Sequence, residues 1–424
     1  MDVSVTDVNE VEKEIHFEIG IEELTPYFEK AYKEYAQKAE IKGFRKGKAP
    51  LHIIKTLFGE SIEYNSLDTV ASDIFKTAID ERNIKPINEP TLTDIDYKRG
   101  QFLKFKVKYE IKPNFELKKY KGLKFEKINH VVTDKEVDDE ILRLRKSQST
   151  LQEVDSAPDE EHVITADLQQ IDESGNPIIG NKDTDIRIYL ANETIYPEMK
   201  TALLNTKKGE VKRVKIERIE KDKKEINNIE ITVKKIEKVN IPEYNDELVI
   251  KLSKNKITNK DEFRTQLRKE IEDFWNGESE KKLTENIISE IVRNHEFIVP
   301  ESLVKNILDS YIEDLKNRYP DKKLPSDFNE EEYREKNKSY AVFQAKWFLI
   351  REKIIENENI SVSDDDFNTL AGKESVKYNI EKERLIQFYK NSHSVKEQIL
   401  TEKLISFLKQ NSKITEKQTE DYNI

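Results

Sequence analysis

Hydrophobic and polar residues alternate along two stretches of the first 112 residues. From Lys104 to Lys108 a lysine occupies every second position, and apolar side chains stand between and beside the lysines. A period of two is typical of a strand with one buried face and one solvated face. Residues 11–19 follow the pattern more loosely, with apolar side chains at Val11, Ile15, Phe17 and Ile19. We therefore expect a sheet in this part of the chain.

Helical spacing separates these two predicted strands. Aromatic and alanine side chains recur every three or four residues between Tyr27 and Tyr35, directly after the start signal Thr25-Pro26. A second helical run extends from Leu51 toward Ile79, and Pro113 closes the segment. Residues 1–112 are therefore predicted to form an α+β domain whose two helices lie on one side of the sheet.

Residues 113–154 are predicted to be a connector, and residues 155–240 a separate β-rich domain. In the connector, Thr133-Asp134-Lys135-Glu136 resembles a capping box at a helix start. One short helix is expected between Tyr196 and Leu204. The strands expected around it, with a turn at Gly175, are Val163–Ile171, Ile186–Leu190, Val211–Ile219 and Ile229–Val239.

From residue 241 to residue 424 the apolar spacing is helical. Val299-Pro300 marks the start of one helix, and Tyr340 to Ile354 predicts a long one. The polar tail from Thr415 is expected to fray. The chain is thus predicted to be an α+β multidomain protein with an all-α C-terminal domain.

Composition narrows the chemistry that this chain can perform. Of its 424 residues 37% are charged, the net charge is −11, and cysteine is absent. Disulfides and thiolate sites are therefore excluded, and the six scattered histidines do not have zinc-ligand spacing. The start of the chain lacks the pattern of a signal peptide, and the most apolar run, Tyr340–Ile350, is short and contains Lys346. We expect a soluble cytoplasmic protein without a metal or another cofactor.

One basic stretch stands out in this acidic chain. From Lys42 to Gly59 there are five Lys or Arg residues and no acid. Within it, Gly43-Phe44-Arg45-Lys46-Gly47-Lys48-Ala49-Pro50 predicts a tight exposed loop that carries one aromatic side chain. A nucleotide-binding loop needs four residues between its glycines and Ser or Thr after the lysine, so that reading fails. A solvated basic turn and a docking contact with an acidic partner both remain open on the pattern alone.

The same loop resembles the signature of the trigger factor family, the ribosome-associated bacterial chaperones. The resemblance covers nearly the whole chain. Its further matches in the helical region are Val299-Pro300-Glu301-Ser302-Leu303, Trp347-Phe348-Leu349-Ile350 and Phe388-Tyr389-Lys390-Asn391. The resemblance implies that the loop docks on the large ribosomal subunit beside the nascent-chain exit. The residues it assigns to this contact are Gly43, Phe44, Arg45, Lys46, Gly47 and Lys48, with Phe44, Arg45 and Lys46 at its centre.

The resemblance also implies that residues 155–240 are similar to FK506-binding-protein prolyl isomerases. Catalysis there needs an apolar, aromatic-walled pocket that twists an X-Pro bond against a barrier of about 18–20 kcal/mol. Here Glu198 replaces a usual Gly, and the hairpin between Ile219 and Ile229 looks shortened. The candidate pocket residues are Ile178, Ile195, Tyr196, Met199 and Ile229, and at Ile178, Met199 and Ile229 an aromatic is expected. We predict weak or absent isomerase activity.

Apolar stripes of the C-terminal helices are by default core. A domain built of separate helical hairpins cannot bury every apolar stripe, so some stripes stay exposed to solvent. Exposed apolar patches rimmed by charge suit the binding of unfolded clients. The candidates for a client surface are Phe274, Trp275, Tyr311, Tyr340, Phe343, Phe388 and Tyr389.

The main hypothesis is an ATP-independent chaperone that holds newly synthesised chains open near the tunnel exit and assists folding and export. Its expected partners are the large ribosomal subunit and unfolded nascent polypeptides, with no membrane, and the resemblance leaves open a homodimer off the ribosome. One alternative is an active peptidyl-prolyl isomerase that acts on nascent chains. Another is a ribosome- or RNA-binding module that does not chaperone.

Overall fold

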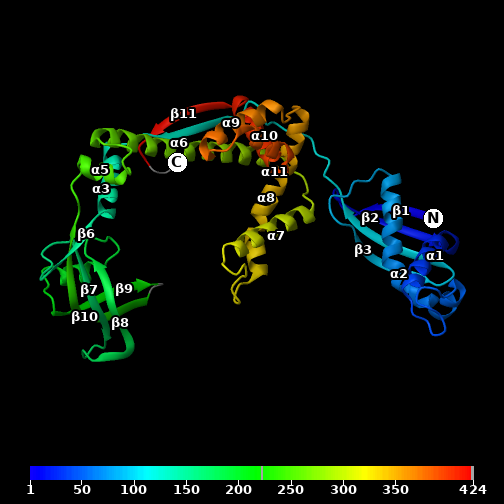
Figure 1. The fold of residues 1–424 in the computed structure, drawn as a ribbon, viewed down its shortest axis with the longest axis horizontal. Coiled ribbons are helices and arrows are strands. Elements are labelled where there is room, and N and C mark those ends of the chain that lie inside the picture. Colours follow the sequence, from blue (N-terminus) through cyan, green and yellow to red (C-terminus); the bar gives the residue numbers. More distant parts are fainter. Residues whose placement is uncertain (221–222, 422–424) are drawn as a thin grey trace. The chain divides into compact units, whose positions relative to one another are not determined.

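The computed structural model describes residues 1–220 and 223–421, and it divides into two compact units. Unit 1 joins Met1–Lys127 to Lys281–Thr415, and unit 2 joins Ile128–Glu280 to the residues from Glu416 onward. Figure 1 shows the elements of both units in sequence colours. Within the described residues, no helix combines the length and apolar character needed to cross a membrane.

The first part of unit 1 is a four-stranded antiparallel sheet with two helices. Its order is β1-β2-β4-β3, and the register places Phe17 opposite Phe105. These two rings stack at 4.5 Å in the core that the sheet shares with both helices. The elements are β1 (Asp2–Asp7), β2 (Glu12–Gly20), α1 (Ile21–Lys38), α2 (Leu51–Glu81), β3 (Thr91–Lys98) and β4 (Phe102–Glu110). The predicted strands and helices of this segment are confirmed.

The predicted start of the first helix is wrong. Helix α1 begins at Ile21, directly after strand β2, and Pro26 lies inside the helix. The Thr25 hydroxyl donates to the Ile21 carbonyl, and the early residue Leu24 is fully buried. Burial of the first turn against the sheet therefore extends the helix beyond the position that the Thr-Pro signal marks.

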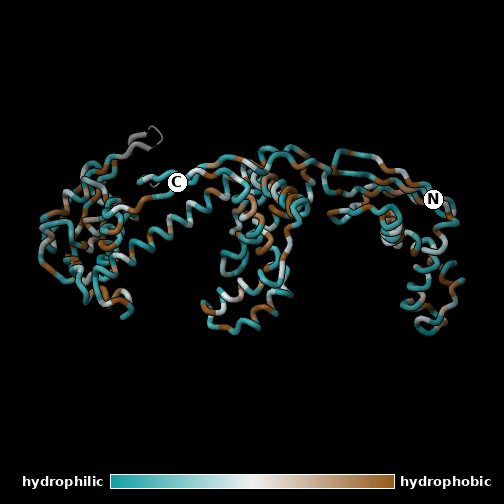
Figure 2. Tube along the Cα trace, turned by 90° about the horizontal axis from the view of Figure 1, so that it is seen from above, coloured by the Kyte–Doolittle hydropathy of each residue, from teal (hydrophilic) through white to brown (hydrophobic). Residues whose placement is uncertain are grey.

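The second part of unit 1 is helical. Its core joins the end of α6 to α8 and α11, and connector residues Tyr120 and Leu123 pack into it. The helices are α6 (Lys260–Arg293), whose last part from Lys281 belongs to this unit, α7 (Glu301–Asn317), α8 (Glu330–Asn357), α9 (Asp364–Tyr378), α10 (Lys382–Asn391) and α11 (His393–Gln410). Figure 2 shows hydrophobic and hydrophilic residues following one another along these helices.

Residues 415–419 of the C-terminal tail are not frayed, contrary to the prediction. Strand β11 (Lys413–Thr419) pairs with β5 (Lys124–His130) in a two-stranded sheet. The Lys413 amide donates to the Leu123 carbonyl at 2.7 Å, and the Val131 amide donates to the Thr419 carbonyl at 2.8 Å. The prediction of an all-α C-terminal domain is wrong at this point, because the strand's partner lies almost 300 residues away and leaves no local signal.

Unit 2 contains a five-stranded antiparallel sheet with the path β6-β10-β7-β8, and β9 also pairs with β10. The predicted capping box is confirmed, because the Thr133 hydroxyl accepts from the Glu136 amide and the Glu136 carboxylate accepts from the Thr133 amide. The elements are α3 (Asp134–Ser147), β6 (Thr150–Val154), β7 (His162–Ile171), β8 (Pro177–Tyr189), α4 (Pro197–Leu203), β9 (Val211–Glu220), β10 (Lys223–Asn240), α5 (Asp246–Leu252) and the first part of α6. Strand β8 begins at Pro177, nine residues before the predicted start at Ile186.

Candidate functional sites

The basic loop joins α1 to α2, and its two glycines set its shape. Gly43 and Gly47 have φ values of +95° and +74°. The Gly47 amide donates to the Ala39 carbonyl at 3.2 Å, and the Lys48 amide donates to the Arg45 carbonyl at 2.9 Å. A Cβ on Gly47 would lie 2.8 Å from the Gln37 carbonyl oxygen. Gly47 therefore allows the loop to pack closely on the end of α1.

The tip of this loop presents an apolar ring between cations. Phe44 is 40% exposed, and Arg45, Lys46 and Lys48 are exposed beside it. Lys46 pairs with Glu40 at 3.0 Å, but both side chains are largely exposed, so this ion pair holds Lys46 only weakly. Pro50, with φ of −60°, then leads into the first turn of α2. The predicted docking residues thus lie together on one exposed loop.

A buried carboxylate that sequence reasoning missed joins the helices next to this loop. Glu63 of α2 is 7% exposed and accepts hydrogen bonds from Tyr32 of α1, from Tyr97 at 2.6 Å and from Arg99 at 3.0 Å. Burial alone would raise the pKa of Glu63, but the bonds from Tyr32, Tyr97 and Arg99 together hold this pKa below its ordinary value. Burial and the Glu63 carboxylate raise the pKa of Tyr32 to about 12.

A glycine makes room for this cluster. A Cβ on Gly59 would lie 2.9 Å from the Arg99 guanidinium. One turn nearer the loop, the rings of Tyr35 and Phe58 lie 5.7 Å apart across α1 and α2. The loop is therefore anchored by two layers of contact between the helices. The sequence contains no local signal for Glu63, because Glu60 and Asp68 stand in the same stretch of α2.

The second candidate site is a groove of about 850 Å³ among α6, α7, α8 and α11 in unit 1. Its apolar lining comprises Ile288, Leu303, Ile307, Tyr340, Phe343, Ala345, Trp347 and Phe348. Tyr340 is 57% exposed, and its ring stacks near those of Tyr311 at 6.3 Å and Phe343 at 6.2 Å. The fold therefore gathers Tyr311, Tyr340 and Phe343, three of the predicted client residues.

The other predicted client residues lie elsewhere. Phe274 is 60% exposed in unit 2 and meets Trp275 edge-on at 5.4 Å, while Trp275 packs beside a core cluster. In unit 1, Phe388 is 65% exposed, but the neighbouring Tyr389 is buried in a core cluster and donates to Glu374. Tyr389 is therefore a core residue and not part of an open surface. Adjacent positions on a helix point in different directions, which separates this pair.

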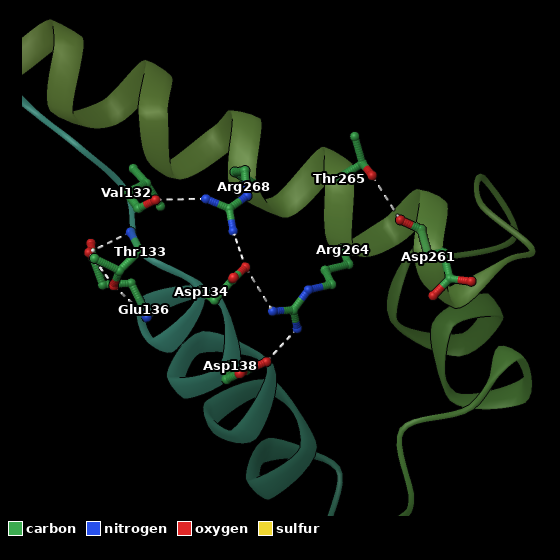
Figure 3. A network of polar contacts seen from close by, with 9 residues as sticks. All are labelled: Val132, Thr133, Asp134, Glu136, Asp138, Asp261, Arg264, Thr265 and Arg268. Atoms are coloured by element: carbon green, nitrogen blue, oxygen red, sulfur yellow. Dashed lines mark hydrogen bonds and ion pairs between the residues drawn. The ribbon is translucent and has the colours of Figure 1, made fainter.

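Ion pairs join the helix that carries Phe274 to the connector helix of the same unit. Figure 3 shows Arg264 and Arg268 of α6 beside Asp134 and Asp138 of α3. Arg268 also donates to the Val132 carbonyl at 2.7 Å, just before the capping box. Two arginines one turn apart thus hold the start of α3. In the first turn of that helix, the carboxylates of Asp134 and Glu136 also face the positive end of the helix dipole.

The candidate isomerase residues divide into two groups. Ile195, Tyr196 and Ile229 pack against the core of unit 2, and Met199 is buried within it. Ile178 is 37% exposed on β8, and its neighbour Ile179 is 98% exposed. The structure therefore gathers four of the five residues and leaves Ile178 outside that cluster. The predicted shortening of the hairpin between Ile219 and Ile229 falls on a segment that includes residues 221–222, which lie outside the described residues.

Comparison with known proteins adds to this geometry. The family model described as bacterial trigger factor protein matches residues 1–144, and the model for the C-terminus of that protein matches residues 260–410. A trigger factor from Chloroherpeton thalassium is 32% identical, with 88% of each chain covered. One from Salinibacter ruber is 28% identical over 92% of this chain and 88% of its own, and one from Prosthecochloris aestuarii is 30% identical over 92% and 91%.

A solved structure shares the fold. It is described as "Promiscuous Substrate Recognition in Folding and Assembly Activities of the Trigger Factor Chaperone". The two sequences are 22% identical and the TM-score is 0.50, and the match covers 97% of this chain and 99% of the other. Fold and sequence together define a multidomain folding chaperone. The chain belongs to the trigger factor family, which confirms the resemblance that its loop suggested.

Proposed function

We propose that this protein is an ATP-independent chaperone that docks on the large ribosomal subunit through the loop at residues 43–48 and holds emerging chains in the cytoplasm. The observation that carries the proposal is the exposed Phe44 between cations on a loop whose glycines and anchoring helices fix its shape. Cations suit the phosphates of ribosomal RNA, and an exposed ring suits an apolar site on a neighbouring protein.

Each predicted segment has a part in this proposal. Residues 1–112 bind the ribosome, and residues 113–154 form a connector that joins the C-terminal domain. Residues 155–240 form the FKBP-like domain, and residues 241–424 bind clients. Docking keeps the client surfaces at a high effective concentration around the emerging chain, so individually weak contacts suffice.

Cosedimentation with ribosomes tests the docking residues. We expect Phe44→Ala/Arg45→Ala/Lys46→Ala to weaken binding by about 30-fold, the factor that corresponds to losing roughly 2 kcal/mol at a small anchor cluster. A matched control, Lys76→Ala/Lys85→Ala, also removes two positive charges, but from exposed positions outside the loop. This control should bind like the parent. Parent-like binding by the triple variant would remove the basis of the proposal.

The groove lined by α7 and α8 is the proposed client surface. Tyr340 and Phe348 line it and are exposed, so replacing them leaves the helical core intact. We expect Tyr340→Ser/Phe348→Ser to suppress aggregation of an unfolded client less well than the parent, while ribosome cosedimentation stays unchanged. Phe274→Ser, in unit 2, shows whether a second surface contributes. A parent protein that suppresses no aggregation at any ratio would instead favour the ribosome-binding module without chaperoning.

The isomerase alternative concerns the β-rich domain alone. Met199 is buried, and Ile195, Tyr196 and Ile229 pack on the core, an arrangement that supports a structural role for these side chains. We propose weak or absent catalysis. A proline-limited refolding assay tests this, and robust acceleration by the protein would establish the alternative.

A homodimer off the ribosome also remains a proposal. Sedimentation velocity over a concentration series tests it.

A further inference from the structure

Helix α7 begins without a cap of its own. Its N-cap residue is Pro300, and no side-chain cap hydrogen bond comes from that position. The first amides of a helix have no partner within the helix, and Ser, Thr, Asp or Asn at the N-cap commonly supplies one. Proline has no side-chain oxygen that could do so. The α7 amides at Glu301 and Ser302 are therefore left to water or to an acceptor from elsewhere in the protein.

Glu110 supplies that acceptor from the N-terminal sheet. Its Oε1 accepts from the Glu301 amide at 2.8 Å, and its Oε2 accepts from the Ser302 amide at 3.1 Å. Glu110 is the last residue of β4, is 9% exposed and stands 191 positions before Glu301. A carboxylate in this position also faces the positive end of the helix dipole.

The backbone of Glu110 is held from the sheet side. Its amide donates to the Asn88 side chain at 3.0 Å, and its carbonyl accepts from the Ile87 amide at 2.9 Å. Two residues further on, Lys112 pairs with Glu352 of α8 at 2.8 Å, though Lys112 is exposed and this pair contributes little. The buried Glu110 contact is therefore the stronger of these two connections between the sheet and the helices α7 and α8.

We propose that Glu110 is a positioning residue that links α7, and with it one wall of the groove, to the N-terminal sheet. Leu303 and Ile307 of α7 line that groove, and both lie within two helical turns of the contact. The link is a property of the chain's own contacts and stands without the proposed function. Only its consequence for clients rests on that function.

The competing explanation is that Glu110 only caps α7 and does not link it to the sheet. One substitution distinguishes the cap from the link. Pro300→Ser gives α7 an N-cap of its own, so the double variant Glu110→Ala/Pro300→Ser restores the cap without the link. Amide exchange at Glu301 and Ser302 reports the cap. It should be about fivefold faster in Glu110→Ala than in the parent and return to the parent's rate in the double variant.

A distance measurement reports the link. The chain contains no cysteine, so Asp96→Cys on β3 and Lys305→Cys on α7 are unique sites for two spin labels, and both positions are exposed. The parent and Pro300→Ser should give one narrow distance distribution. Glu110→Ala and the double variant should lose the narrow peak and spread over a broad range, because flexible arrangement is the default where few contacts join two parts of a chain.

Two results would overturn the proposal: a narrow distribution in Glu110→Ala, or a narrow distribution restored in the double variant, which would leave only a local cap. If Glu110→Ala does not fold by circular dichroism, Glu110→Gln takes its place. Loss of the narrow peak is again expected, because a glutamine amide has one acceptor oxygen where the two α7 amides now donate to two carboxylate oxygens. The distances need neither ribosomes nor clients. They therefore judge the link even if the parent shows no ribosome binding.

The consequence for clients is measured separately. Glu110→Ala leaves the loop at 43–48 unchanged, so cosedimentation should match the parent while aggregation suppression is weakened. Suppression equal to the parent, with a broadened distance distribution, would confirm the link and reject its role in the groove.

Discussion

Gly47 is the residue at which the shape of the loop at residues 43–48 is most tightly constrained. A side chain there faces two penalties, a left-handed backbone that costs an L-residue about 1–2 kcal/mol and a contact of 2.8 Å with the Gln37 carbonyl. Gly43 faces only the first, because nothing lies within 4 Å of a Cβ at that position. We expect Gly47→Ala to weaken ribosome cosedimentation more than Gly43→Ala does. Equal effects would show that the close packing on α1 does not matter for docking.

Glu63 makes the stability of the N-terminal sheet and its helices depend on pH. The folded-state pKa of Glu63 lies below its unfolded value, so its contribution is fully present above the unfolded pKa, near 4.3–4.5, and is lost as the pH falls through the folded pKa. We expect Glu63→Gln to lose about 1.5–3 kcal/mol at pH 7, the range for hydrogen bonds to a charged group. Its unfolding free energy should also fall less steeply than that of the parent below pH 4.5.

Urea unfolding followed by circular dichroism at pH 7 and at points between pH 5 and pH 3 measures both effects. Asp73→Asn is the matched control, because this half-buried acid of α2 pairs with Lys30 of α1, so the pair joins the same two helices. An identical pH profile for Glu63→Gln and the parent would contradict the role assigned to the buried carboxylate.

These two residues differ in how far the sequence reveals them. The loop is visible because glycines, cations and Phe44 lie within six positions, and the absence of acids from Lys42 to Gly59 is a local property. Glu63 is not visible in this way. Its partners Tyr32, Tyr97 and Arg99 come from α1, β3 and the β3–β4 turn, and only the folded sheet brings them to one carboxylate.

At the scale of elements, strand β11 ties the C-terminal end of the chain to strand β5. We expect truncation after Asn411, which removes β11, to expose strand β5 to amide exchange and to lower the melting temperature. The physical reason is the loss of the ladder that includes the Lys413–Leu123 and Val131–Thr419 hydrogen bonds. Truncation after Thr419 keeps the strand and is the control. Unchanged exchange in β5 after the longer truncation would contradict this pairing.

The elements also show where hydrophobic periodicity in the sequence is sufficient to predict a strand or helix and where it is not. The alternation at residues 102–109 predicted β4 because one face of that strand is buried and the other solvated. Strand β11 alternates little, and its residues are mostly exposed, so its pairing with β5 left no hydrophobic pattern. Helix α1 began early because the buried Leu24 and Phe28 outweighed the Thr25-Pro26 signal.

At the scale of the whole molecule, an acidic chain is expected to approach an acidic ribosome through one basic loop. Its net charge is −11, so attraction comes from the local cations and not from the overall charge. We expect ribosome affinity to fall as salt rises. Arg45→Ala should reduce the slope of log affinity against log salt by about 0.7–0.9 if Arg45 contacts one phosphate.

Phe44→Ala is the matched comparison for this salt series. It removes apolar contact and no charge, so it should lower the affinity at every salt concentration and leave the slope unchanged. A change in slope for Phe44→Ala, or none for Arg45→Ala, would contradict the division of roles between the ring and the cations.

By itself, the sequence determined the exposed basic loop at residues 43–48, the α+β multidomain class and most strands and helices, because each depends on neighbours within a few residues. Tertiary structure alone decided which apolar side chains stay open: Tyr340 on the groove, Phe388 on the surface and its neighbour Tyr389 in the core. It alone also paired β11 with β5 and placed Glu110 at the start of α7. These outcomes depend on contacts between segments far apart in the chain, and the pattern within one segment does not identify the distant segment that packs on it or pairs with it.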